Sequence, residues 1–170
     1  MRHPKADERQ RREFQHATQR CRRPIVYIDE SGFANDMPRT HGYASIGQRC
    51  HGSVDWHSKG RINVIGAISD FKLITTCLFD THINSDIFYA WLTQDLLPKL
   101  KRSCVIVMDN ASFHKRADMI RAIKRAGHRL LFLPPYSPDL NPIEKKWAQA
   151  KAFRKKLQCS IDQLFYLYNL

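Results

Sequence analysis

Hydrophobic positions in the first half of the chain predict three strands. Residues 25–29, 61–69 and 72–79 are apolar and rich in β-branched side chains, which favour strands. The last two segments are separated only by Asp70 and Phe71, so they predict an antiparallel hairpin closed by a tight turn. Together the three segments predict an antiparallel meander.

The segment that follows the hairpin has the periodicity of a helix. Between residues 84 and 100, large apolar side chains recur at spacings of three and four, which is typical of one face of an amphipathic helix. Asn84 or Ser85 is the expected cap, and Pro98 should end the helix or lie in its last turn.

Strands and helices alternate in the second half of the chain. Short apolar runs predict strands at residues 103–108 and 128–133, and a helix is expected between them at residues 115–126. A final helix should begin near Asn141, after the run PPYSP has ended the fifth strand. This order predicts an α/β fold of one domain, with a mixed five-stranded sheet flanked by helices.

The first 24 residues differ in composition from the rest. They contain eight Lys or Arg against three Asp or Glu and few large apolar side chains. Such a segment buries too little surface to offset its ordering entropy unaided. We therefore expect a basic arm or interdomain linker at residues 1–24, although RQRREFQHATQRCRR could form a helix against a partner.

Overall charge favours a polyanionic partner. The formal net charge is +12 and the pI is about 9.8, which suits nucleic acid better than a small neutral substrate. No apolar run approaches the roughly 20 residues that span a bilayer, and no secretory signal is recognisable. We expect a cytoplasmic protein without a membrane partner.

The cysteines do not predict a structural role. There are five, an odd number with no CxxC pair, which indicates reduced thiols rather than a disulfide framework or a paired-cysteine zinc site. A cluster of His41, Cys50, His51 and His57 could gather around zinc, but its spacing matches no familiar zinc pattern.

Residues 31–59 are rich in Gly, His, Ser and Arg and are expected to form loops and short hairpin strands. Three aromatic residues in this segment, Phe33, Tyr43 and Trp56, stand among basic side chains. They could contact DNA, but local packing is the favoured role.

Three acidic residues stand where elements begin or end. Asp29 and Asp109 each end an apolar strand, and Glu144 stands at the start of a basic helix. Side chains alternate along a strand, so if Asp29 faces a site then Glu30 points the other way. Magnesium and manganese prefer oxygen ligands. The hypothesis is that Asp29, Asp109 and Glu144 converge on one metal site.

Glu144 also has a purely structural interpretation. With Asn141 as cap and Pro142 at the first helical position, Glu144 would fall at the third position and complete a capping box. Against this, residues 145–156 hold six Lys or Arg and no acid, so the carboxylate stands at the head of a basic face. Ile143, Trp147 and Ala150 should form the inward stripe of this helix.

The runs IDESGF, MDNASFHK and LPPYSPDLNPIEKKW resemble the motifs of the mariner-like DDE transposases, in particular their bacterial insertion-sequence branch. The resemblance covers residues from about 24 to the C-terminus. It implies a ribonuclease-H-like fold in which Asp29, Asp109 and Glu144 are the acidic triad. Asn110 and His114 match the DN and the following His of the family and are expected to support the site.

The resemblance implies a metal-dependent enzyme that cuts and joins DNA at insertion-sequence ends. Two Mg²⁺ or Mn²⁺ ions would neutralise the triad and assist an in-line displacement. The expected partners are double-stranded DNA, at transposon ends and target, and a second copy of the chain in a homodimer. Among the basic residues of the last helix, the predicted DNA contacts are Lys145, Lys146, Lys151 and Lys155.

Full-length relatives carry an N-terminal helix-turn-helix region, and the residues before Asp29 are too few to hold one. We therefore expect residues 25–170 to be a catalytic domain alone, without that DNA-binding domain. Two alternatives remain open: a catalytically inactive DNA-binding remnant of a transposase, and a ribonuclease-H-type nuclease acting on RNA–DNA hybrids.

Overall fold

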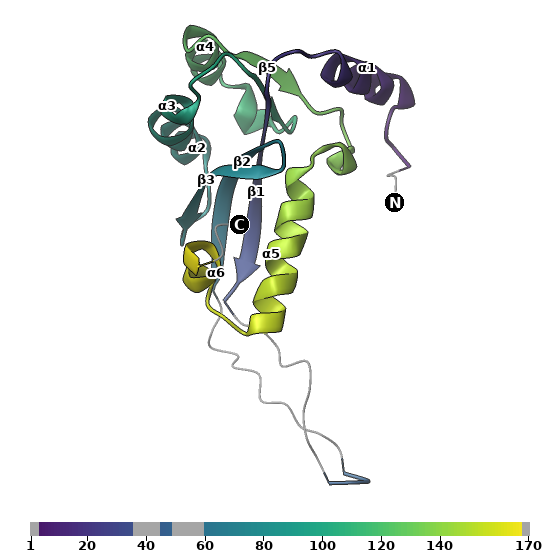
Figure 1. The fold of residues 1–170 in the computed structure, drawn as a ribbon, viewed down its shortest axis with the longest axis vertical. Coiled ribbons are helices and arrows are strands. Elements are labelled where there is room, and N and C mark those ends of the chain that lie inside the picture. The colour runs from purple at the N-terminus through teal and green to yellow at the C-terminus, as the bar shows by residue number, and fades with distance from the viewer. Residues whose placement is uncertain (1–3, 36–44, 49–59, 168–170) are drawn as a thin grey trace.

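A computed structural model describes residues 4–35, 45–48 and 60–167 of the chain (Figure 1). Its centre is a mixed five-stranded sheet with the strand order β3-β2-β1-β4-β5. Neighbours are antiparallel from β3 to β1 and parallel from β1 to β5. The strands are β1 (Ile25–Ala34), β2 (Arg61–Ser69), β3 (Lys72–Phe79), β4 (Val105–Met108) and β5 (Arg129–Phe132).

Helices cover both faces of the sheet. The α-helices are α1 (Glu8–Gln19), α2 (Ser85–Trp91), α3 (Leu97–Lys99), α4 (Ala117–Arg125), α5 (Ile143–Leu157) and α6 (Ile161–Leu167). A π-helical turn, Leu92–Leu96, joins α2 to α3, and 3₁₀ turns lie at Ser112–Lys115 and Pro138–Leu140. The expected architecture, a mixed five-stranded sheet flanked by helices, is confirmed.

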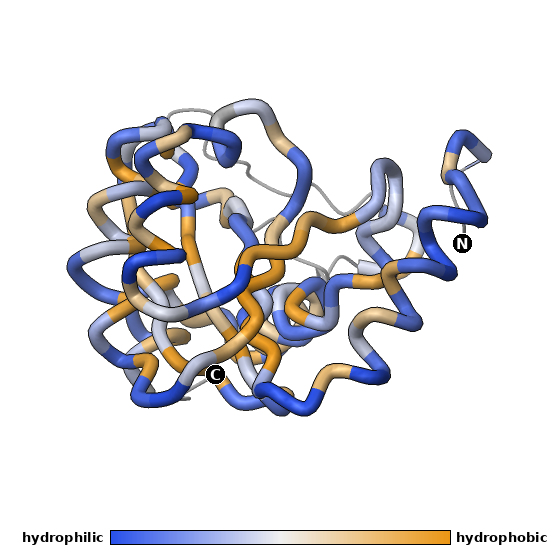
Figure 2. Tube along the Cα trace, turned by 90° about the horizontal axis from the view of Figure 1, so that it is seen from above, coloured by the Kyte–Doolittle hydropathy of each residue, from blue (hydrophilic) through white to orange (hydrophobic). Residues whose placement is uncertain are grey.

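Alternation along the central strands assigns each face its helices. Even-numbered positions such as Val26 and Ile28 of β1 lie in a core with α2, the π-helical turn and α4. On the opposite face, α5 and α6 pack against β1 and β2, with Ile143, Trp147 and Ala150 buried as the inward stripe. Figure 2 shows hydrophobic residues concentrated along the central strands, whereas α1 is largely hydrophilic.

Local signals in the sequence account for the element boundaries. Asp70 and Phe71 both have positive φ, 50° and 60°, as a tight turn between β2 and β3 requires. Asn84 caps α2 by accepting the backbone N–H groups of Asp86 and Ile87. Gly127, at φ 82°, ends the helical segment before β5.

Several expectations were wrong in detail. β1 runs on to Ala34, so the first residues of the expected loop segment belong to a strand. Phe33 is packed in the core, which confirms the local packing favoured for it. A helix was expected at residues 115–126, but α4 covers only Ala117–Arg125, and its buried residues are Met119 and Ile123. α6 was not expected. Tyr43, Trp56 and the histidine–cysteine cluster at 41–57 lie outside the described residues.

The N-terminal segment forms α1, which lies against the same domain. Phe14 packs with Val105, Val107 and Leu133 on the face that α5 also covers. Arg11, only 3% exposed, donates two hydrogen bonds to the Asp139 carboxylate, at 2.9 and 2.6 Å. No helix in the described ranges is long and apolar enough to span a bilayer.

Candidate active site

Strand register brings the first two acidic residues together. β1 and β4 are parallel neighbours, with Tyr27 paired to Val107. Two residues further along each strand stand Asp29 and Asp109, and because side chains alternate they point to the same face as the paired residues. Adjacent strands are about 4.8 Å apart. The register of β1 against β4 therefore places the carboxylates of Asp29 and Asp109 side by side.

The third acidic residue reaches the same place from α5. Asp29, Asp109 and Glu144 all line one cavity of about 380 Å³, which lies between β1, the end of β4 and the start of α5. The loop from Leu133 to Pro138 forms another wall of the cavity. Three residues far apart in the sequence thus share one open space.

Asp29 is the most buried of the three acids. Its Oδ2 accepts a hydrogen bond of 3.2 Å from the Trp147 indole N–H. Burial raises the pKa of Asp29 to about 8, and the negative charges of Glu144, Glu30 and Asp109 contribute in the same direction. The carboxylate is therefore poorly compensated by protein groups alone, which is the situation that a cation relieves.

The position of Trp147 depends on Gly66. This glycine of β2 stands directly opposite Asp29 in the sheet. A Cβ at residue 66 would lie 2.5 Å from Cη2 of the indole and 2.9 Å from Cζ2. The absence of a side chain on β2 therefore leaves the space in which the indole ring lies over the sheet and reaches Asp29.

Asp109 is oriented by a buried histidine. His114 is 1% exposed, and its Nδ1 lies 2.5 Å from Oδ1 of Asp109, while its Nε2 lies 3.0 Å from the carboxylate of Glu30. The backbone N–H of Ala111 donates to the same Oδ1 at 3.0 Å. Oδ1 is thus held by two donors, and no hydrogen bond within the described residues occupies Oδ2, which leaves it for a ligand.

Electrostatics in this chain favour a charged imidazole. Burial opposes the cation, but the hydrogen bonds and charges of Asp109 and Glu30 raise the pKa of His114 to about 9. Burial also acts against ionised Asp109, yet the His114 hydrogen bond holds its pKa below the ordinary value. Protonated His114 donates from both ring nitrogens, so it fixes Asp109 as a carboxylate.

The capping box, the alternative interpretation of Glu144, does not form at the start of α5. The helix begins at Ile143 without a side-chain cap. The Asn141 amide turns instead toward β1, with Nδ2 3.5 Å from the Ile28 carbonyl oxygen. Glu144 is exposed, and among the described residues its carboxylate has no hydrogen bond or ion pair. Its side chain is therefore available to the cavity rather than committed to its own helix.

Basic side chains extend from this cavity along α5. Lys145, Lys151 and Lys155 are exposed and Lys146 is half-buried. The ammonium group of Lys151 lies 5.4 Å from the centre of the Phe33 ring, which holds it near β1. At the far end of α5, Arg154 donates to the carbonyl oxygens of Ala34 and Asn35, at 2.5 and 3.1 Å.

The donor set fits a hard divalent cation. Three carboxylates line the cavity, together with Asn141, whose Oδ1 is buried and has no hydrogen-bond partner within the described part of the chain. In the same described ranges, no three His, Cys, Asp or Glu side chains are yet close enough to hold a metal ion.

Sequence reasoning missed three residues at this site. Glu30 was expected only to point away from Asp29. Its carboxylate contacts His114, and His114 in turn contacts Asp109, so Glu30 helps to position Asp109. Trp147 was assigned to the core alone, and Asn141 to a cap. Asn110 lines the cavity as expected, and its supporting role stays a prediction.

Comparison with known proteins was made by sequence and by structure. The sequence model of a family described as DDE superfamily endonuclease matches residues 24–164. The transposable element Tcb1 transposase of Caenorhabditis briggsae is 30% identical over 109 residues, which are 61% of this chain and 40% of that protein.

Two solved structures have the same fold. The Mos1 transposase paired-end complex with left transposon end aligns with a TM-score of 0.69 at 17% identity, over 91% of this chain and 51% of that one. The Mos1 mariner paired end complex with Mn aligns with a TM-score of 0.66 at 18% identity, over 90% and 51%. The fold is therefore ribonuclease-H-like, and the chain spans about half the length of these relatives.

Proposed function

Because the chain belongs to the DDE superfamily endonucleases, we propose that it is the catalytic domain of a mariner-like transposase that cleaves and transfers DNA strands at insertion-sequence ends. The assignment to the bacterial insertion-sequence branch rests on the run LPPYSPDLNPIEKKW. In this proposal residues 25–170 form the catalytic domain, and the protein acts in the bacterial cytoplasm, on nucleoid DNA.

One observation carries the proposal. Asp29, Asp109 and Glu144, from β1, the end of β4 and α5, line a single cavity, and their mutual repulsion contributes to the raised pKa of Asp29. Carboxylates about 4 to 6 Å apart repel by roughly 3 to 4 kcal/mol per pair at an effective dielectric near 20. A cation bound between the three carboxylates would offset this repulsion.

The protein groups have distinct roles in the proposed chemistry. Asp29, Asp109 and Glu144 would hold two Mg²⁺ or Mn²⁺ ions, which supply charge neutralisation, an activated water or 3′ hydroxyl and a stabilised leaving oxygen. Trp147 holds Asp29, and the Glu30–His114 pair holds Asp109 with one oxygen turned to the cavity. Glu144 closes the set from the first turn of α5.

The proposed substrate is double-stranded DNA, at the transposon ends and at the target. The Mos1 complex with a left transposon end supports this partner, as does the formal net charge of +12. The proposed contacts with the DNA backbone lie on α5, at Lys145, Lys146, Lys151 and Lys155. The proposed assembly is a homodimer.

Metal-dependent nicking of supercoiled plasmid tests the function. The wild-type chain should nick in Mg²⁺ or Mn²⁺ and not in EDTA, and Asp109→Asn should lower the nicking rate by at least about 100-fold, because catalysis is lost when a ligand carboxylate becomes an amide. Asp80→Asn is the matched control, since Asp80 is exposed on the surface.

Each alternative predicts another result. If Asp109→Asn nicks as fast as the wild type, the activity comes from a contaminant and the catalytic proposal fails. If the wild type and the variants bind DNA but none of them nicks it, the inactive remnant is favoured instead. Preference for an RNA–DNA hybrid over duplex DNA in a substrate panel would favour the ribonuclease-H-type nuclease.

A further inference from the structure

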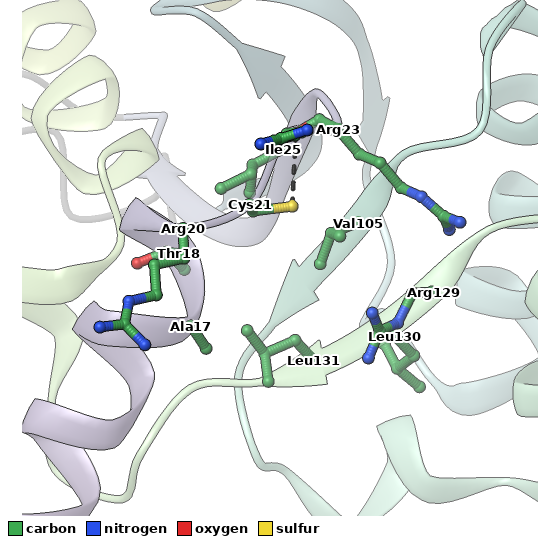
Figure 3. Close-up of a pocket in the computed structure, with 11 residues that line it drawn as sticks. Ala17, Thr18, Arg20, Cys21, Arg23, Ile25, Val105, Arg129, Leu130 and Leu131 are labelled. Carbon is green, nitrogen blue, oxygen red and sulfur yellow. Dashed lines mark hydrogen bonds between the residues drawn. The ribbon is translucent and has the colours of Figure 1, made fainter.

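A second cavity lies at the C-terminal end of α1. It has a volume of about 310 Å³ and is bounded by the end of α1, the link to β1 and the outer strand β5. Four arginines belong to its lining, and we call it the arginine pocket: Arg20, Arg22, Arg23 and Arg129. Figure 3 shows Arg20, Arg23 and Arg129 on different elements around the apolar side chains of Val105 and Leu131.

The four guanidinium groups of the arginine pocket are exposed and lack protein partners. No ion pair or hydrogen bond involves their side chains within the described residues. Three other arginines of the chain have partners: Arg11 pairs with Asp139, Arg116 with Asp86 and Asp118, and Arg154 with backbone carbonyls. Four uncompensated cations around one cavity favour an anionic ligand.

The arginine pocket is connected to the candidate active site through a third cavity. Ala17 and Leu131 line both the arginine pocket and this intermediate cavity, which runs beside α1. The intermediate cavity shares Asn110 and the loop residues 133–135 with the acidic cavity. The three cavities therefore form a continuous path along the surface, from four arginines to the three carboxylates.

We propose that the arginine pocket binds the phosphodiester backbone of the DNA strand that leads away from the acidic cavity. The inference rests on the proposed function, because it takes the strand end to lie at Asp29, Asp109 and Glu144. Arginine forks donate paired hydrogen bonds to phosphate oxygens. The apolar floor, which includes Ile25, Val105 and Leu131, suits the deoxyribose edge of the same strand.

The arrangement suits a strand better than a single small anion. The four arginines come from α1, the link and β5, and their side chains are exposed around the rim rather than gathered at one point. A chain of successive phosphates can contact such separated groups in turn. Each phosphate that a protein cation neutralises contributes about 0.9 to the slope of log K against log salt concentration for duplex DNA.

Salt-dependent binding of a labelled DNA duplex, in EDTA, tests the proposal. The triple variant Arg20→Gln, Arg23→Gln, Arg129→Gln should bind with a slope smaller by about 2 to 3 than the wild type. The matched control removes the same charge elsewhere, at Lys72 on β3 and at Arg121 and Lys124 on α4, all exposed. The control slope should change by less than about 1.

Equal slopes for the two triple variants, or no DNA binding by the wild type, would overturn the arginine pocket as a strand site. So would binding of inorganic phosphate that the first variant loses while its DNA binding matches that of the wild type, since that marks a small-anion site. Circular dichroism melting of both variants establishes that they fold. Binding without nicking contradicts the proposed function alone.

Alkylation of Cys21 gives an independent measurement. This half-buried thiol lies within the arginine pocket, and Cys77 on β3 is a half-buried reference on the far side of the sheet. Saturating DNA should slow the reaction of Cys21 with N-ethylmaleimide several-fold and leave Cys77 unchanged. An unchanged rate at Cys21 under saturating DNA would contradict the proposal.

Discussion

Asp29 concentrates the electrostatic conflict of the site in one side chain. Its pKa rises from 3.8 to about 8 in the folded protein, because burial and neighbouring carboxylates disfavour the charge. Between these two values the unfolded chain has lost the proton and the folded chain keeps it. The metal-free protein therefore loses stability as pH rises from about 4 toward 8.

Replacing this carboxylate should stabilise the metal-free protein. We expect Asp29→Asn to raise the free energy of unfolding at pH 8 by about 1 to 3 kcal/mol, which is about 2 to 4 °C in Tm for each kcal/mol, with little change near pH 4. Thermal melts in EDTA at the two pH values measure this. The same variant should not nick plasmid. An equal shift in Tm at both pH values would contradict the electrostatic origin.

At the scale of elements, β2 and α5 are fitted to each other through one missing side chain. Gly66 leaves room for the Trp147 ring, and the ring in turn donates to Asp29. The acidic cavity therefore depends on how closely a helix approaches a strand that contributes no functional group of its own.

A methyl group at this contact should disturb both packing and function. Gly66→Ala places a Cβ within 3 Å of the indole, so we expect a loss of about 1 to 3 kcal/mol in stability and a lower nicking rate. Urea unfolding and the plasmid assay measure the two effects. Trp147→Phe is the comparison, because it relieves the contact but loses the N–H. If Gly66→Ala leaves both quantities unchanged, the close approach has no consequence.

Sequence periodicity identified most elements but not all of their ends. The hairpin strands were predicted with their observed bounds, because β-branched runs flank a turn that positive φ values confirm. β1 continued past Asp29 since its partner β2 supplies hydrogen bonds that the single segment does not reveal. Glu30 and Asn141 gained their contacts only from elements distant in sequence, which no local pattern encodes.

At the scale of the whole molecule, α1 is tied to the sheet by a charged contact. Arg11 is almost fully buried beneath its own helix and pairs with Asp139, which lies in the turn just before α5. A residue expected to belong to a solvated arm thus connects the N-terminal segment to the wall of the acidic cavity.

Breaking this pair should loosen α1 from the domain. In Asp139→Asn the buried guanidinium loses its counter-charge, so we expect a loss of about 1 to 3 kcal/mol in stability and faster trypsin cleavage after Arg20 or Arg22. Glu13→Gln, which affects an exposed pair with Arg9, is the control. Wild-type cleavage rates in Asp139→Asn would show that apolar contacts alone hold the helix.

Arg154 and Glu144 lie near opposite ends of one helix, α5. A 15-residue α-helix is about 22 Å long, and its tail is fastened to the exit of β1 by two hydrogen bonds. A displacement of this end of β1 would shift or tilt α5 as a rigid unit. Glu144 would move with the helix. A displacement at the end of β1 would therefore change the distance from Glu144 to Asp29 and Asp109.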